Sequence, residues 1–144
     1  MALKSSTGLK NQILTSNPLS GILGGGVIKI YGGTVPADAD AAESATLLCT
    51  VTDDAGAGGL SFEASAVDGV IQKLSTQIWR GVNSASGVAT HYRFVSTADT
   101  GVASTTEARL QGTVGLIGAD LNLSNTTLTS GASQTIEYYA ATLL

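Results

Sequence analysis

Residues able to carry out acid–base, nucleophilic or metal chemistry are scarce in this sequence. His91 is the only histidine and Cys49 the only cysteine. A nucleophilic serine needs a neighbouring base, and no serine here stands in a Gly-x-Ser-x-Gly motif. A transition-metal site needs several His or Cys ligands, which one residue of each type does not supply. We therefore expect no catalytic residue, no metal, no cofactor and no disulfide within the chain.

The densest group of carboxylates lies between Pro36 and Ala45, where Asp38, Asp40 and Glu43 stand close together. Carboxylate oxygens suit a hard cation, but this stretch lacks the glycine and the ligand spacing of an EF-hand loop. It is therefore predicted to be a solvated acidic loop. The glycine-rich stretches at 24–26 and 56–59 do not form a nucleotide fingerprint, because neither stands between a strand and a helix.

The composition is that of a folded chain with few charges. Hydrophobic residues make up 43% and charged residues 12%, with a net charge of −4. Soluble domains average ~25% charged residues. Gly, Ala, Ser and Thr account for 70 of the 144 residues. A surface of this kind suits close packing against neighbouring proteins, although an ordinary soluble β domain fits the composition too.

Nucleic acid and membrane are not expected partners. The seven Lys and Arg residues are scattered along the chain, so they cannot neutralise several phosphates at once. The first residues are followed by polar ones rather than by the apolar core of a signal peptide. No apolar stretch approaches the ~20 residues that span a bilayer. We expect the protein to stay in the compartment where it is made unless other machinery carries it.

From residue 27 onward, short apolar or alternating stretches are separated by turn residues. The clearest runs from Val88 to Ser96, where Tyr92 and Phe94 lie on one face of a strand and His91 and Arg93 on the other. About eight or nine strands are expected, with no long amphipathic helix between them. The sequence predicts an all-β domain over residues 27–144, either a jelly roll or a related antiparallel β-sandwich.

Residues 1–26 lie outside this pattern and are predicted to form an N-terminal arm with a short helix. Ser5-Ser6-Thr7 can cap a helix that runs to about Leu14, and Gly24-Gly25-Gly26 can act as a hinge. We expect this arm and the C-terminal strand to bind a neighbouring subunit, the strand by β-augmentation. The alternative is that the arm folds back on its own sheet as a lid. The expected interface residues are Leu9, Ile13, Leu14, Ile22, Leu23, Tyr138, Tyr139, Leu143 and Leu144.

Several stretches resemble small virion proteins of tailed bacteriophages, in particular capsid cement or decoration proteins. These stretches are Met1–Asn11, Gly26–Gly33, Pro36–Leu48, Gly118–Thr127 and the closing strand with Ile136, Tyr138 and Tyr139. The segments 53–69 and 97–108 carry little of the resemblance. It implies a jelly-roll fold without catalytic residues, and a place on the exterior of the capsid after synthesis in the host cytoplasm.

The function that this resemblance implies is structural. The protein would bind the outside of a phage capsid and stabilise it by bridging neighbouring capsomers, with the major capsid protein as partner and a homo-oligomer, dimer or trimer, as its own state. The alternative is a sugar- or protein-binding β-sandwich module of a phage tail or fibre. Its candidate sugar-binding face comprises Trp79, Tyr92, Phe94, Tyr138 and Tyr139. An enzyme is the third hypothesis, and the shortage of reactive groups argues against it.

Overall fold

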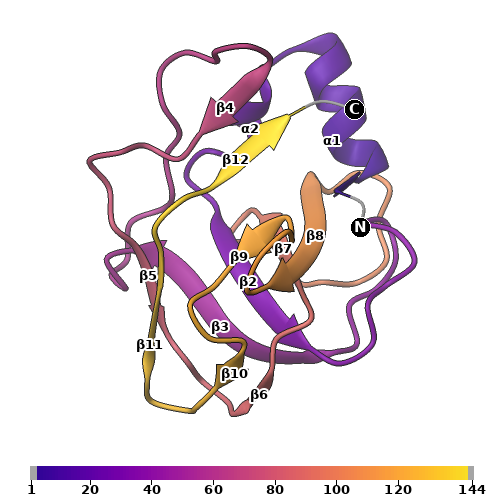
Figure 1. Cartoon of the computed structure of the whole chain (residues 1–144). Helices are drawn as coiled ribbons and strands as arrows, with labels where there is room; N and C mark the ends of the chain where they lie inside the picture. The colour runs from indigo at the N-terminus through magenta and orange to yellow at the C-terminus, as the bar shows by residue number, and fades with distance from the viewer. Residues whose placement is uncertain (1–2, 143–144) are drawn as a thin grey trace.

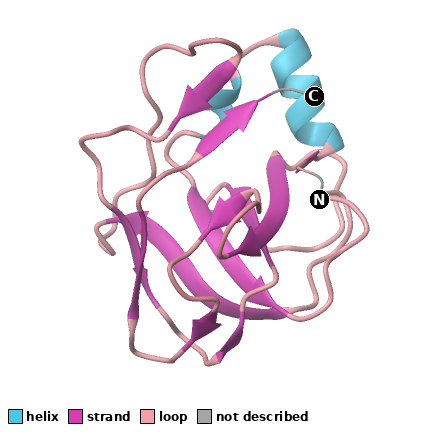
Figure 2. Ribbon diagram, viewed as in Figure 1, coloured by secondary structure: helices cyan, strands magenta, loops and turns pink. Residues whose placement is uncertain are grey.

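Strands account for 37% of the residues and helices for 10%, which confirms the predicted all-β antiparallel sandwich class. The computed structural model describes residues 3–142 (Figures 1 and 2). No helix in this range is long and apolar enough to cross a membrane. In chain order the elements are β1 (Lys4–Ser5), α1 (Thr7–Thr15), α2 (Leu19–Leu23), β2 (Val27–Gly32), β3 (Thr46–Asp53), β4 (Val70–Gln72), β5 (Trp79–Val82), β6 (Gly87–Val88), β7 (His91–Val95), β8 (Arg109–Gly115), β9 (Leu121–Asn122), β10 (Thr127–Leu128), β11 (Ser133–Ile136) and β12 (Ala140–Thr142).

The largest sheet is built around β2, which pairs with β3 on one side and with β7 on the other. Beyond β7 the sheet continues with β8 and β1, and beyond β3 it continues with β5 and β11. These pairs are antiparallel, whereas β9 pairs with β8 in parallel. Two short antiparallel pairs, β6 with β10 and β4 with β12, lie at opposite ends of the molecule (Figure 1).

The core lies on one face of this sheet because side chains alternate between the two faces of each strand. Ile28 of β2 is in register with Phe94 of β7, and Ile30 is in register with Tyr92. All four side chains are fully buried. Trp79 of β5 joins them, with its ring edge-on to Phe94 at 5.8 Å between centroids. Aromatic pairs in this arrangement add to the free energy of apolar burial.

Tyr139 closes the core from the C-terminal end of the chain. Its ring lies 5.6 Å from that of Trp79, and its hydroxyl lies 2.8 Å from the hydroxyl of Tyr92. Buried hydroxyls need hydrogen-bond partners, and these two satisfy one another. Burial raises the pKa of both phenols well above the ordinary value. The predicted interface role of Tyr139 is therefore wrong, because this side chain is a core residue of its own chain.

The N-terminal segment is also part of the domain. Strand β1 pairs with β8, and the Ser6 hydroxyl accepts a hydrogen bond from the Leu9 amide at 3.1 Å, which caps α1 as predicted. Leu9 and Leu23 are 0% and 1% exposed and pack into the main core. The expected contact of these two leucines with a neighbouring subunit is therefore wrong, because both side chains are covered by their own domain.

The three glycines at 24–26 are held in place rather than acting as a hinge. The Gly25 amide donates to the Leu60 carbonyl at 2.8 Å, and the Leu60 amide donates to the Gly26 carbonyl at 2.9 Å. A Cβ atom at Gly26 would lie 2.3 Å from the Val95 carbonyl oxygen, so only glycine fits between these two backbones. The boundary predicted at residue 26 does not separate an arm from a domain. The alternative, a segment folded back on its own sheet, describes the structure.

We predict that the Leu9→Ala substitution lowers the free energy of unfolding by about 2–5 kcal/mol, because it removes a fully buried side chain from a packed core. The matched control is Leu14→Ala on the same helix, where the side chain is 82% exposed and little packing is lost. Urea unfolding of both variants measures the difference. Equal stabilities would mean that α1 is not packed as described.

Candidate functional site

The face of the sheet opposite the aromatic core carries buried polar side chains. His91 and Arg93 of β7, with Arg109 and Gln111 of β8, are at most 2% exposed. The alternation that sends Tyr92 into the core sends these four side chains to the other face. They are hydrogen-bonded to residues of the 33–45 and 96–108 segments, which cover this face. We call the buried polar layer the set His91, Arg93, Arg109, Gln111, Glu43 and Asp99.

Arg109 joins both covering segments to the sheet. Its guanidinium donates to both carboxylate oxygens of Asp99, from Nε at 2.6 Å and from Nη2 at 2.8 Å. It also donates to the carbonyls of Ala39 at 3.2 Å and Val102 at 2.6 Å. Burial opposes ionisation of Asp99, but the hydrogen bonds from Arg109 and from the Gly101 amide outweigh it and hold the pKa of the carboxyl below its usual value. A bidentate pair of this kind is strong and fixes orientation.

Arg93 and Gln111 hold the 33–45 segment in the same way. Arg93 Nε donates to Gln111 Oε1 at 2.9 Å, and Arg93 Nη2 donates to the carbonyls of Ala41 at 2.8 Å and Asp38 at 3.2 Å. The Gln111 amide donates to the Pro36 carbonyl at 3.0 Å. A loop without secondary structure leaves backbone carbonyls unpaired, and buried ones need donors. The side chains of β7 and β8 supply those donors.

Glu43, His91 and Thr90 form a chain that resembles an acid–histidine–hydroxyl arrangement. His91 Nε2 lies 2.9 Å from Glu43 Oε2, and His91 Nδ1 lies 2.8 Å from the Thr90 hydroxyl. The imidazole is fully buried and stacks on the Tyr31 ring at 5.3 Å. The Thr90 hydroxyl also donates to the Gly33 carbonyl at 2.9 Å. Because the imidazole has no open side for a substrate, this geometry suits holding the 33–45 segment rather than catalysis.

The expectation of a solvated acidic loop is wrong at Glu43, which is buried. The Glu43 side chain is 3% exposed and pairs with His91, and Arg93 Nε lies 3.7 Å from its carboxylate. Asp40 accepts hydrogen bonds from the amide and hydroxyl of Thr7, which lower the pKa of its carboxyl and fix the start of α1. Asp38 accepts from the Ala41 amide at 2.9 Å. The carboxylates therefore hold the loop in place.

The predicted interface residues are divided between the core and the surface. Leu9, Leu23 and Tyr139 are core residues, as described above. Ile13 and Ile22 are half-buried against the core. Leu14 and Tyr138 are exposed and remain available to a partner. Leu143 and Leu144 lie outside the described residues 3–142.

The predicted sugar-binding face is also wrong, because most of its side chains are buried. Trp79, Tyr92, Phe94 and Tyr139 pack against one another inside the domain. Only Tyr138 of that predicted set presents its ring to solvent. A sugar platform needs exposed aromatic faces, and four of the five residues do not provide them.

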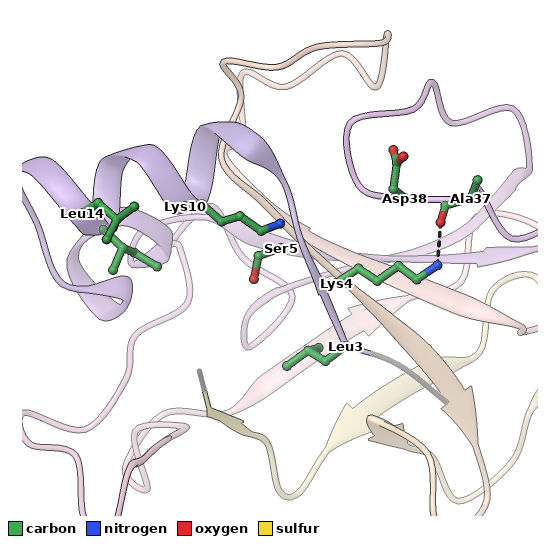
Figure 3. A pocket seen from close by; sticks show the side chains of 8 residues that line it. Leu3, Lys4, Ser5, Lys10, Leu14, Ala37 and Asp38 are labelled. Carbon is green, nitrogen blue, oxygen red and sulfur yellow. Dashed lines mark hydrogen bonds between the residues drawn. The ribbon is translucent and has the colours of Figure 1, made fainter. Parts of the chain in front are cut away.

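Of the surface grooves formed by the described residues, two combine exposed apolar side chains with charged ones. The first, which we call the α1 groove, has a volume of about 610 Å³ and lies between β1, α1 and the start of the 33–45 segment (Figure 3). Its lining residues are Leu3, Lys4, Ser5, Lys10, Ile13, Leu14, Ala37 and Asp38. Lys4 reaches across the groove and donates to the Ala37 carbonyl (Figure 3).

The second groove, which we call the β11 groove, has a volume of about 460 Å³ and lies between the β8–β9 region and the edge strand β11. Leu116 and Tyr138, which are 61% and 63% exposed, contribute to its lining. Ile117, which follows Leu116, is 90% exposed. Large apolar side chains exposed together mark interaction surfaces more often than those exposed singly. No sequence motif predicts this second groove; only the apolar residues near the C-terminal end of the chain pointed toward it.

We predict that the Asp99→Asn substitution lowers the free energy of unfolding by about 3–5 kcal/mol, because it leaves the buried Arg109 guanidinium without its counter-charge. The matched control is Asp54→Asn, which breaks the exposed pair between Asp54 and Arg80 and should cost less than about 1 kcal/mol. Asparagine also tolerates the positive φ of 50° at position 54. Chemical denaturation of both variants compares the two pairs, and similar losses would contradict a supporting role for the polar layer.

We also predict that the protein loses stability in acid. The carboxyls of Glu43 and Asp99 have folded-state pKa values below their ordinary values of 4.5 and 3.8. Their contribution is therefore complete above about pH 5 and is lost as the pH falls through 4.5 toward the folded-state values. Urea midpoints measured between neutral pH and pH 3 should fall over this window. A midpoint that stays constant or rises on acidification would contradict the prediction.

Comparison of the chain with protein-family models, curated proteins and solved structures finds no match. Its function must therefore be argued from its own surface and chemistry.

Proposed function

We propose that the chain is a structural virion protein that binds the exterior of a tailed-phage capsid and stabilises it by bridging neighbouring capsomers. The observation that supports this proposal best is how side chains are divided between interior and surface. The buried polar layer uses the charged groups to hold loops, while large apolar side chains stand exposed beside two grooves. The choice of a capsid as the bound surface comes from the sequence resemblance.

A surface of this kind suits protein contacts. The centre of an interface is depleted in charged residues and enriched in aromatic and apolar ones. Leu14, Leu116, Ile117 and Tyr138 have this character and are exposed. Loops that become ordered on binding lose conformational entropy, which weakens affinity. A domain whose loops are already fixed in the free state loses less conformational entropy when it binds. The hydrogen bonds of Arg93 and Arg109 fix the 33–45 and 96–108 segments before any partner arrives.

The mechanical role follows from the arrangement of a shell. Packaged DNA presses outward, and the shell separates first where capsomers meet. A protein bound across that boundary adds contact area, and a standard interface buries ~1,600 Å². Many copies bound around the shell act together, so a modest affinity for each copy is sufficient. The proposed function requires binding and rigidity, and it uses no chemical step.

We predict that the chain is found on the head of virions purified from lysates in which it is produced. Electron microscopy of particles labelled with an antibody against the chain gives its place, and deletion of its coding sequence gives its effect. Heads lacking the protein should release DNA at a lower temperature or after milder osmotic shock. Label confined to tails or fibres, or heads of unchanged resistance, would overturn the capsid proposal.

A further inference from the structure

The α1 groove places the Lys10 ammonium beside apolar side chains, and Lys4 and the Asp38 carboxylate also line it. Leu3 and Ile13 are half-buried, and Leu14 is largely exposed. Lys10 is exposed on the same face of α1, because residues at i, i+3 and i+4 lie together on a helix. Figure 3 shows the Lys10 and Leu14 side chains on the helix above the groove.

Lys10 differs from the other cations of the chain. Within residues 3–142, it is the one cation whose ammonium or guanidinium group makes no hydrogen bond or ion pair. The other six donate to groups of their own chain: Lys4 to Ala37, Lys29 to Asp99, Lys73 to Gln77, Arg80 to Asp54, Arg93 to Gln111 and Arg109 to Asp99. Lys10 attracts the Asp40 carboxylate of its own chain, but the two groups do not form an ion pair or hydrogen bond. The ammonium therefore remains available to a partner beside the exposed Leu14.

A second surface carries the opposite charge beside exposed apolar side chains. We call it the Tyr138 patch and define it as Leu116, Ile117, Glu137 and Tyr138. Leu116, Glu137 and Tyr138 line the β11 groove, and Ile117 follows Leu116 in the chain. The Glu137 carboxylate is exposed and makes no hydrogen bond or ion pair with the described residues. The patch shares no lining residue with the α1 groove.

We propose that the α1 groove of one copy binds the Tyr138 patch of a second copy, with Lys10 of the first opposite Glu137 of the second. Burial of Leu14 against Tyr138 and its apolar neighbours supplies most of the favourable free energy. The charge pair selects the orientation, because complementary charges steer encounter and like charges across an interface are strongly unfavourable. This contact does not rest on the capsid role and is tested on the isolated protein. Because it buries the same apolar side chains that the proposed function assigns to protein contacts, each of these surfaces binds either a second copy or the capsid at one time.

The contact is heterologous, because groove and patch are different surfaces of the same chain. Each copy can therefore bind one neighbour through its groove and another through its patch. Such head-to-tail contacts form a closed ring when the rotation between copies closes, and an open filament when it does not.

The test is sedimentation velocity of the full chain over a concentration series, with single and paired charge reversals. Lys10→Glu and Glu137→Lys should each weaken self-association by about tenfold or more, because each brings like charges together. The double variant, Lys10→Glu with Glu137→Lys, keeps the net charge and should restore association. The matched control is Asn11→Glu, which adds a negative charge to an exposed position of α1 that does not line the groove.

Mixing the two single variants gives a second test that does not depend on absolute affinity. One variant then has a negative groove and a negative patch, and the other has a positive groove and a positive patch. Neither should associate alone, but an equimolar mixture should form alternating assemblies, because every junction pairs opposite charges. Rings with an odd number of copies cannot alternate, so only even rings or filaments should appear in the mixture.

Circular dichroism and urea unfolding establish that each variant is folded before it is compared. A wild-type chain that stays monomeric throughout the concentration series would overturn the proposal. So would a Tyr138→Ser variant that associates as well as the wild type. Equal weakening by Lys10→Glu and Asn11→Glu, or a double variant that remains monomeric, would show that Lys10 does not pair with Glu137 and would also overturn it.

Discussion

The hydrogen bonds and ion pair of the buried Arg109 guanidinium are the contacts on which the rest of the structure depends. Arg109 lies in β8 and reaches a carboxylate at position 99 and carbonyls at positions 39 and 102, so one side chain joins two long loops to the sheet. An unpaired charge at this depth would be very costly, and the loops are needed to satisfy it. The loops in turn have few apolar side chains of their own and need the donors of β7 and β8. Sheet and loops therefore require one another.

This arrangement explains how a chain with so few charged residues uses them. Most of its cations and several carboxylates are committed to internal contacts, which leaves a surface rich in small neutral residues and exposed aliphatic side chains. The aromatic core and the buried polar layer occupy opposite faces of the same strands. In β7 and at the start of β8, successive residues thus alternate between apolar packing and loop attachment. The proposed functions rest on that division.

Local pattern was sufficient to predict much of the fold, and long-range contacts account for what it missed. The alternation of His91 and Arg93 with Tyr92 and Phe94 placed the two pairs on opposite faces, and the Ser6 cap and the first helix were predicted from turn chemistry. Local sequence does not show that residues 36–43 cover His91 and Arg93, so the acidic residues of this stretch predict a solvated loop. Except at Leu14, which is exposed, the apolar residues of the first 26 positions predicted burial but not what covers them. Periodicity does not distinguish burial against the same chain from burial against another chain. The β11 groove brings together residues near 116, 123 and 138, and no motif links them.

The contacts of Ser6 have a consequence for how the chain folds as it is made. Its hydroxyl accepts from the Leu9 and Arg109 amides and donates to the Glu107 carbonyl, so the cap of the first helix is completed by residues about a hundred positions later. Tyr139 adds a core side chain from the far end. A chain leaves the ribosome from its N-terminus, so the first helix meets these partners only after residues 107 and 109 have emerged. Such distant pairing makes folding slow, so nascent copies expose Leu9 and the neighbouring core residues for longer than a domain of local contacts would.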